Sequence, residues 1–498
     1  MSRTTQLICL ESGLAGATPH SQPSPTRRDF LRQAIGVTAS MSGIGSQSAF
    51  AAETWSAATG RRPDPGDRKF NSKAVEEFLV KTSRLIADPV LRSLFVNCFP
   101  NTLDTTVIPG AFEGKPDTAV ITGDIPAMWL RDSSAQVWPY LSFAASDEQL
   151  RRLLEGVIRR QARCLLIDPY ANSFMADLSA PPLEWGQKDR TEMKQGVGER
   201  KYELDSLCYP IRLAHGYWKA TGDVSPFDRR WKDAMALVVD TMRVQQRKNG
   251  DGPYRFKRAA ENPTDSLVNG IGNPCKPVGL VASCFRPSDD ACLFPFLIAS
   301  NLFAVTSLRQ LAEMSNTILR DSKLALAANN LADEVAAALL HYGVAATSTG
   351  NIWAYEVDGF GGQVLMDDAN VPSLLSLPYL DSSPDPALYA NTRRFLWSSR
   401  NPWFFQGTAG EGIGGPHIGR DSIWPMSQII YALTSTSNAE ILHSIQQLKL
   451  GSAGTGFIHE SYRSSDAHAF TRSWFAWANT LFGELIAKTV STKPQLLA

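Results

Sequence analysis

The 498-residue sequence lacks several features that mark common classes of protein. It carries no surplus of charge, because 49 basic residues balance 49 acidic ones. Nucleic acids and anionic membranes both select for a basic surface. No apolar run beyond the N-terminal region approaches the roughly 18 residues that cross a bilayer. These absences argue against nucleic acid as a partner and against a membrane anchor.

Motifs that bind metals or phosphate are also missing. None of the seven cysteines forms a C-x-x-C pair, which disfavours zinc and thioredoxin-type sites. His459 and Glu460 begin like the zinc-protease motif H-E-x-x-H, but residue 463 is arginine rather than histidine. The glycine-rich residues 407–419 contain no phosphate-binding pattern. We therefore expect no metal and no cofactor, and the cysteines leave open one disulfide at most.

The N-terminus has the order of a twin-arginine signal peptide. Residues 26–31 read Thr-Arg-Arg-Asp-Phe-Leu, a weakly apolar stretch follows, and Ala49-Phe50-Ala51 is a small-x-small cleavage site. We predict a signal peptide at residues 1–51, a leader segment at 52–72 and one catalytic domain at 73–498. The signal predicts a bacterial protein that the twin-arginine translocase exports to the periplasm or beyond.

Helical periodicity recurs throughout the predicted domain. Trp231, Met235, Val238 and Met242 form one apolar stripe, and residues 324–339 repeat the pattern. Ser146 and Gln149 read as a capping box at another helix start. Strand patterns are scarce, with short hairpin candidates at 254–258 and 352–357. The sequence predicts an all-α protein with minor short hairpins, whose helix pairs stack around an axis with the site in the loops at one end.

Residues 122–133 hold polar side chains that core packing does not explain. They place Asp124, Trp129, Arg131 and Asp132 beside a helix start. Carboxylates and a guanidinium offer hydrogen bonds in fixed directions, which neutral sugar hydroxyls need. The alternative interpretation is a local Arg131–Asp132 ion pair, with Ser133 as a helix cap.

Further polar segments follow along the chain. Glu203 and Asp205 stand before a predicted helix, where they either hold hydroxyls or favour the helix N-terminus. Asp289 and Asp290 enter an apolar run, so burial and like charge can raise one pKa, as a general acid requires. The alternative is a helix cap at Ser288. The carboxylates at 367–368 fit a helix-start feature better than a ligand pair.

Taken together, these segments resemble glycoside hydrolase family 125, which contains exo-α-1,6-mannosidases of bacteria and fungi. The resemblance runs in order from about residue 73 to 487, and residues 184–198 match it least. Its long motifs are residues 122–136, 201–210, 286–291, 366–374, 414–417 with 423–425, 459–461 and 474–485.

The resemblance implies an (α/α)6 toroid and metal-independent hydrolysis of a terminal, non-reducing α-1,6-linked mannose with inversion. It places the general acid within residues 286–290 and the general base at Glu460. We assign the acid to Asp289, although spacing alone does not separate it from Asp290. The expected substrate is a mannose-containing oligosaccharide or glycan. The residues expected to bind it are Asp124, Trp129, Arg131, Asp132, Glu203, Asp205, Arg286, His417 and His459.

Two other functions fit parts of the sequence. An inverting phosphorylase of the same toroid type would need a basic phosphate pocket and would leave Glu460 without a role. A non-catalytic glycan-binding protein would keep the aromatic and Arg/Asp contacts but tolerate the loss of Asp289 and Glu460. Because both carboxylates are present, we favour catalysis.

Export is expected to require the arginine pair at 27–28. Replacing Arg27 and Arg28 by lysine should retain the protein in the cytoplasm, as cell fractionation and immunoblotting would measure, whereas Arg32→Lys should leave export unchanged. Arrival of the double variant in the periplasm would show that the signal has been misread.

Overall fold

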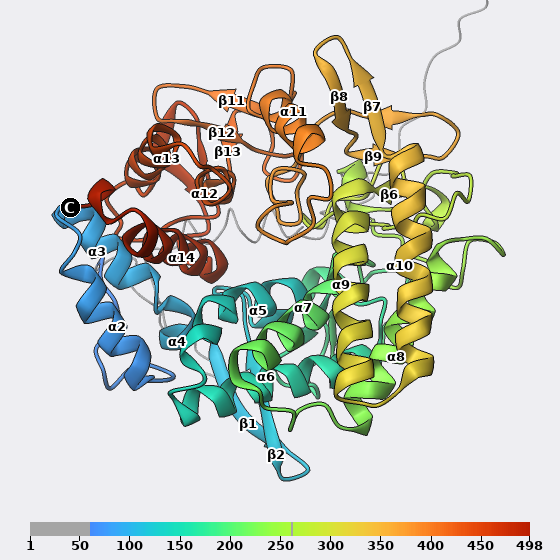
Figure 1. Ribbon diagram of the computed structural model, residues 1–498, viewed down its shortest axis with the longest axis horizontal. Helices are drawn as coiled ribbons and strands as arrows, with labels where there is room; N and C mark the ends of the chain where they lie inside the picture. Colours follow the sequence, from blue (N-terminus) through green and yellow to red (C-terminus); the bar gives the residue numbers. More distant parts are fainter. Residues whose placement is uncertain (1–59, 260–261) are drawn as a thin grey trace, which may run out of the picture. The chain divides into compact units, whose positions relative to one another are not determined.

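The computed structural model describes residues 60–259 and 262–498, which are mostly helical, as expected (Figure 1). The predicted signal peptide and the first part of the leader lie outside these residues. The α-helices, in chain order, are α2 (Lys73–Ser83), α3 (Pro89–Cys98), α4 (Asn101–Thr105), α5 (Leu130–Val137), α6 (Glu148–Ile167), α7 (Leu204–Thr221), α8 (Arg229–Gln245), α9 (Ile298–Thr317), α10 (Ser322–Tyr342), α11 (Pro386–Leu396), α12 (Pro425–Leu433), α13 (Asn438–Gly451) and α14 (Ala476–Thr492).

Strands are more numerous than the sequence predicts, but all are short. Within the described residues they form six small sheets, with the orders β1-β2, β3-β4-β5, β10-β9-β6, β7-β8, β11-β12 and β13-β14-β15. They are β1 (Val107–Phe112), β2 (Lys115–Val120), β3 (Ala127–Trp129), β4 (Ser173–Met175), β5 (Val197–Glu199), β6 (Phe296–Leu297), β7 (Val344–Thr347), β8 (Gly350–Trp353), β9 (Glu356–Val357), β10 (Gln363–Val364), β11 (Phe404–Gln406), β12 (Glu411–Ile413), β13 (Ser422–Ile423), β14 (Ser461–Arg463) and β15 (Asp466–Thr471).

The two predicted hairpins have different outcomes. Residues 352–357 do contain strands, β8 and β9, but these belong to different sheets and do not pair with each other. The prediction for residues 254–258 is wrong, since these residues form only an isolated bridge between Lys257 and Arg190. Tyr254 is instead buried against a neighbouring loop, where its hydroxyl donates to the carbonyl of Arg200 at 2.7 Å and accepts the N–H of Tyr202 at 3.0 Å.

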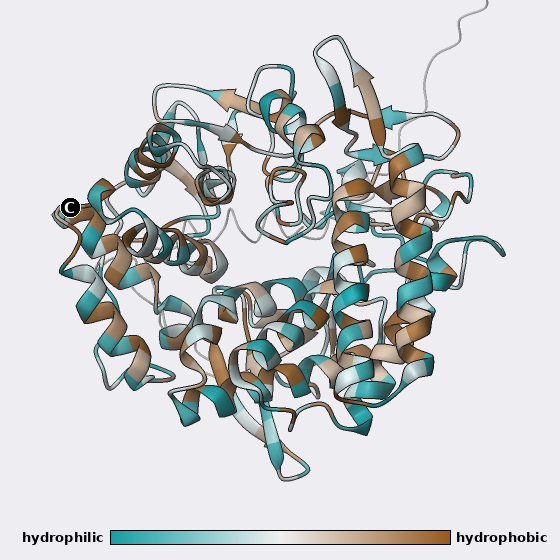
Figure 2. Cartoon of the chain, in the orientation of Figure 1, coloured by the Kyte–Doolittle hydropathy of each residue, from teal (hydrophilic) through white to brown (hydrophobic). Residues whose placement is uncertain are grey.

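The apolar stripes are confirmed, and one predicted cap is wrong. Trp231, Met235, Val238 and Met242 are all buried on α8, and the stripe of residues 324–339 is buried on α10. Hydrophobic and hydrophilic residues alternate along α10 in Figure 2. The N-cap of α6 is Asp147 rather than Ser146, because the Asp147 carboxylate accepts the N–H of Leu150 at 3.0 Å.

The ends of the described chain lie together. α14 packs against α3, α4 and α5, so the last long helix contacts the first helices of the domain (Figure 1). The contact with the α3–α4 junction is close, because a Cβ at Gly483 would lie 2.5 Å from the Cα of Phe99. Glycine at this position lets the two backbones approach.

Residues 60–62 of the leader segment pack against the domain. The Arg62 guanidinium donates to Asp104 at 2.6 Å and to Glu76 at 3.0 Å. The Asn97 amide donates to the carbonyls of Gly60 and Gly456, each at 3.0 Å. Asn97 thus ties the leader to the loop that leads to Glu460.

The six cysteines in the described residues are all free thiols (Cys98, Cys164, Cys208, Cys275, Cys284 and Cys292). Within the same part of the chain, no helix combines the length and the apolar character needed to cross a membrane.

Candidate active site

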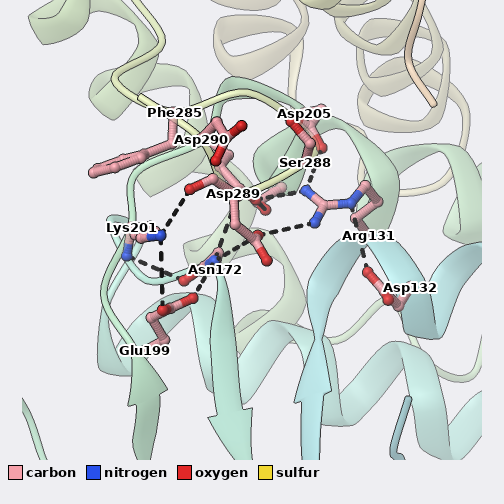
Figure 3. Close-up of polar contacts among 12 residues, drawn as sticks. Arg131, Asp132, Asn172, Glu199, Lys201, Asp205, Phe285, Ser288, Asp289 and Asp290 are labelled. Carbon is pink, nitrogen blue, oxygen red and sulfur yellow. Dashed lines mark hydrogen bonds and ion pairs between the residues drawn. The ribbon is translucent and has the colours of Figure 1, made fainter. Parts of the chain in front are cut away.

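The sheet β3-β4-β5 brings polar residues from three distant segments to one edge. Trp129, Ser173 and Glu199 stand side by side in the antiparallel register. The chain beyond this row carries Arg131 after β3, Asn172 before β4 and Lys201 after β5 (Figure 3). The sheet is only a few residues long, but its register fixes where these side chains meet.

Arg131 is the centre of this cluster, and its side chain is only 4% exposed. Its Nη1 donates to Glu203 at 2.6 Å and to Asp205 at 3.1 Å. Its Nη2 donates to Asp289 Oδ1 at 3.3 Å, and its Nε lies 3.5 Å from Asp132. The structure therefore brings together five predicted site residues.

The simpler interpretation of this segment is wrong in part. Arg131 and Asp132 do form an ion pair, but Arg131 also joins three carboxylates from elsewhere in the chain. Ser133 does not cap α5, because it lies inside the helix and its hydroxyl donates to the carbonyl of Leu130 at 3.3 Å.

Burial raises the pKa values of two of these carboxylates, Glu203 and Asp205. Burial raises the pKa of Glu203 to about 8, with a further contribution from the charge of Asp205 and against the opposing effect of Arg131. Burial likewise raises the pKa of Asp205, again against Arg131. One guanidinium does not compensate for all the carboxylates around it, so Glu203 is largely protonated at neutral pH.

The loop of residues 285–290 is held from several sides. Asp289 has a left-handed backbone with φ 65°, and its carbonyl accepts the Lys201 ammonium at 2.7 Å. Ser288 donates to Asp368 at 2.7 Å, so it does not cap a helix. Arg286, predicted to bind substrate, donates to the buried Glu356 at 2.6 Å. Non-glycine residues with positive φ are uncommon and cluster at functional sites.

Asp289 and Asp290 lie in different surroundings. Asp289 joins Arg131, whereas Asp290 accepts from Thr264 at 3.1 Å and lies 3.4 Å from His417 Nδ1. Burial raises the pKa of Asp290, but its hydrogen bond with His417 and nearby positive charges outweigh this effect and leave the pKa below its ordinary value. A low pKa suits an ionised carboxylate and not a general acid.

Glu460 lies in a second cluster, directly before β14. It accepts from the Thr471 hydroxyl at 3.0 Å and from Arg472 Nη1 at 3.4 Å. Arg472 also donates through Nε to Asp124 at 2.8 Å. Burial lowers the pKa of Arg472, but the charges of Asp124 and Glu460, with a further contribution from Asp132, raise it above its ordinary value. Arg472 therefore stays charged and links two predicted site residues.

His459 lies apart from the carboxylates. It is fully buried, its ring stacks on Phe470 with centroids 3.7 Å apart, and its Nε2 lies 3.0 Å from the Thr455 hydroxyl. Burial lowers the pKa of His459 to about 4, so the ring is neutral at physiological pH. These contacts favour a role in holding the loop over the predicted contact with substrate.

Trp129 is also buried, in a small apolar cluster with Ile125, Ala127 and Leu183. Trp185 packs against this cluster, is partly exposed, and donates through Nε1 to Glu199 at 3.1 Å. Trp129 belongs to the buried apolar packing beside the site, and Trp185 is the partly exposed aromatic ring next to this packing.

Sequence reasoning missed several residues of the two clusters. Asn172 comes before the short strand β4, Glu199 ends the short strand β5, and Arg472 stands two residues before the motif at 474–485. Lys201 is the first residue of the motif at 201–210 but was not singled out, so membership of a motif or proximity to one was the available signal. Asp367 accepts the N–H groups of Leu374 and Leu375, as a helix-start residue does, although a turn forms there instead of a helix.

Comparison with known proteins now identifies the family. The family model described as metal-independent α-mannosidase (GH125) matches residues 88–487. The chain belongs to this family. It is thus a metal-independent α-mannosidase, a glycoside hydrolase. In residues 60–259 and 262–498, no group of three or more His, Cys, Asp or Glu side chains could hold a metal ion.

Two relatives show how far the similarity of this α-mannosidase extends. The meiotically up-regulated gene 157 protein of Schizosaccharomyces pombe is 41% identical over 461 residues, which cover 88% of this chain and 89% of the relative. A solved metal-independent α-mannosidase of Streptococcus pneumoniae, in a non-productive complex with α-1,6-mannobiose, is 40% identical. That match covers 85% of this chain and 100% of the other, with a TM-score of 0.81.

A more distant structure, a wild-type glycosidase, is 13% identical over 84% of this chain and 99% of its own, with a TM-score of 0.50. It shows similarity of fold alone.

The raised pKa of Glu203 predicts a measurable pH dependence of stability. Between about pH 4.5 and 8 the folded state keeps a proton that the unfolded state has released, so stability falls as pH rises, by at most about 1.4 kcal/mol per pH unit for one proton. Glu203→Gln removes this titration, so its melting temperature should fall less than that of the wild type between pH 5 and 8.

The exposed Glu192 offers a control, because Glu192→Gln should follow the wild-type curve. If Glu203→Gln runs parallel to the wild type, Glu203 is ionised in the folded protein at neutral pH.

Proposed function

We propose that this α-mannosidase removes a terminal, non-reducing α-1,6-linked mannose with inversion, using Asp289 as general acid and Glu460 as general base and no metal. The observation that carries the proposal is that two buried carboxylates are each held by a different buried arginine. Arg131 contacts Asp289, and Arg472 contacts Glu460. The linkage is inferred from the similar Streptococcus pneumoniae structure, which is a complex with α-1,6-mannobiose.

In this mechanism the carboxyl group of Asp289 gives its proton to the glycosidic oxygen as the bond to the anomeric carbon breaks. Glu460 takes a proton from a water molecule, and the water oxygen bonds to the same carbon from the opposite face. The product is β-mannose. An inverting pair needs room for that water, so we expect a separation of about 6.5–9.5 Å between the two carboxyl groups.

Asp289 suits the acid better than Asp290. Asp289 belongs to the cluster in which carboxylates outnumber the guanidinium, whereas Asp290 is stabilised as an anion beside His417. Glu460 accepts hydrogen bonds from Arg472 and from the Thr471 hydroxyl, and these contacts hold the carboxyl group in place for the role of a base. A phosphorylase would have no use for a carboxylate held in this way.

The surrounding polar groups are proposed to bind the terminal mannose. Asp132 lies beside Arg131, and its charge also acts on Arg472. It therefore stands between the acid cluster, which surrounds Arg131 and Asp289, and the base cluster, which surrounds Arg472 and Glu460. Ion pairs or hydrogen bonds hold Asp124, which is partly exposed, and the buried residues Glu203, Asp205, Arg286 and His417 around them. Such fixed groups present hydrogen bonds in set directions to sugar hydroxyls.

Two finer statements belong to the same proposal. We infer a closed (α/α)6 toroid, supported by the packing of α14 against α3, α4 and α5. We also infer export through the twin-arginine translocase to the periplasm or beyond, supported by residues 26–31 and 49–51 of the sequence.

Substitution of the two carboxylates tests the mechanism. Asp289→Asn and Glu460→Gln should each lower kcat on α-1,6-mannobiose by about 10²–10⁴-fold, because general acid–base catalysis contributes that much. Product release should be measured by chromatography, and melting temperatures should show that both variants fold. Asp290→Asn is the matched comparison, with a smaller loss expected. An inactive Asp290→Asn beside an active Asp289→Asn would move the acid by one residue.

A further inference from the structure

Asn172 lies between the carboxylates of the acid cluster and is fully buried. It comes directly before β4, and its amide Nδ2 contacts Glu199 Oε2 and Asp289 Oδ1, both at 3.2 Å (Figure 3). Glu203 Oε1 lies slightly further away, at 3.4 Å. One neutral amide therefore contacts three carboxyl groups, two from residues 199–203 and one from Asp289.

The orientation of this amide is fixed by the backbone. Asn172 Oδ1 accepts the N–H of Lys201 at 3.1 Å. Because this oxygen already accepts a hydrogen bond from a backbone N–H, the NH₂ group of the amide must face the carboxylates. The ammonium of the same Lys201 holds the carbonyl of Asp289, so one residue positions both Asn172 and the backbone of the acid.

The amide has two hydrogens for three carboxyl oxygens. The distances assign these hydrogens to Glu199 and Asp289, since Glu203 is the furthest of the three. This assignment agrees with the pKa of Glu203, which burial raises to about 8, because a protonated carboxyl needs no donor there. Glu199 is itself a fixed anchor, accepting from Arg258 at 2.9 Å and from Trp185 at 3.1 Å.

Asn172 and Arg131 donate to the same oxygen of Asp289. Both contacts are to Oδ1, at 3.2 Å for Asn172 and 3.3 Å for Arg131. The χ2 torsion of an aspartate is broad and roughly two-fold, so its partners decide which oxygen points where. Two donors on Oδ1 stabilise that atom as the unprotonated oxygen of a carboxyl group and direct the proton to Oδ2.

We propose that Asn172 is a positioning residue, which together with Arg131 fixes Oδ1 of Asp289 so that the proton for the leaving group is carried on Oδ2. The inference rests on the proposed role of Asp289 as general acid. Without the amide, the carboxyl group loses a donor that helps to set its rotation, and the fraction of molecules with the proton facing the glycosidic oxygen falls.

The test compares two substrates that differ in their need for an acid. Hydrolysis of α-1,6-mannobiose requires protonation of a sugar alkoxide, whereas 2,4-dinitrophenyl α-mannoside releases a stable phenolate without it. Asn172→Leu should lower kcat on mannobiose by about 10- to 100-fold with little change in KM, because misplacement of a catalytic group costs that much. Its kcat on the dinitrophenyl substrate should stay within about 3-fold of the wild type.

A second variant separates the donor from the structural contact. Asn172→Asp keeps an acceptor for the N–H of Lys201 but replaces the donor, so the same selective loss is expected.

Asn301→Leu is the matched control. Asn301 is a fully buried asparagine on α9 whose amide donates to the carbonyls of Val281 and Leu297, each at 2.9 Å. Its loss should leave the ratio of the two activities unchanged.

Asp289→Asn serves as the reference for an acid defect. If it is selective for mannobiose while Asn172→Asp and Asn172→Leu affect both substrates equally, or neither, the role assigned to Asn172 is overturned. If Asp289→Asn itself shows no selectivity, the acid assignment fails instead, and the two failures are thereby distinguished.

Discussion

The guanidinium of Arg131 is buried among more carboxylates than it can neutralise, and the chemistry of the site depends on this imbalance. It contacts Asp132, Glu203, Asp205 and Asp289. Removal of one ion from water costs several kcal/mol even after the surroundings relax, so a single positive charge cannot keep all of these groups ionised. Burial accordingly raises the pKa of Glu203, which favours retention of a proton in the cluster.

The base cluster has the opposite balance. Arg472 forms ion pairs with Glu460 and Asp124, and the Thr471 hydroxyl donates a further hydrogen bond to Glu460. In the proposed mechanism, this difference in the number of carboxylates per guanidinium distinguishes the two roles, although carboxyl groups carry out both of them. Asp289 and Arg472 both adopt positive φ, and such backbones persist only where the surrounding contacts determine them.

Much of the acid cluster could be predicted from the sequence. Asp289, Arg131, Glu203 and Asp205 stand in long polar motifs, and the structure brings them together. Asn172 could not be found, because its neighbours are ordinary and its importance comes from contacts with segments up to 117 positions away. The surroundings of His459 were also not evident from the sequence: its ring packs on Phe470, and its contact with substrate stays a prediction.

The fold also has elements that the sequence predicts and elements that it does not. Helices such as α8 and α10 follow from apolar stripes, since periodicity over 17 or more residues is unambiguous. Strands of two or three residues, such as β3 and β5, are too short for any periodic pattern. They form because tertiary pairing completes their hydrogen bonds, and these short strands are the elements that align Arg131, Asn172 and Lys201.

If Asp289 and Glu460 act from opposite faces of the sugar, the bond at the anomeric carbon is inverted. Proton NMR of the first product released from α-1,6-mannobiose measures this outcome, before mutarotation mixes the anomers. We expect β-mannose as the first anomer. Initial release of α-mannose would indicate a covalent glycosyl-enzyme route and would contradict the assignment of Glu460 as a base.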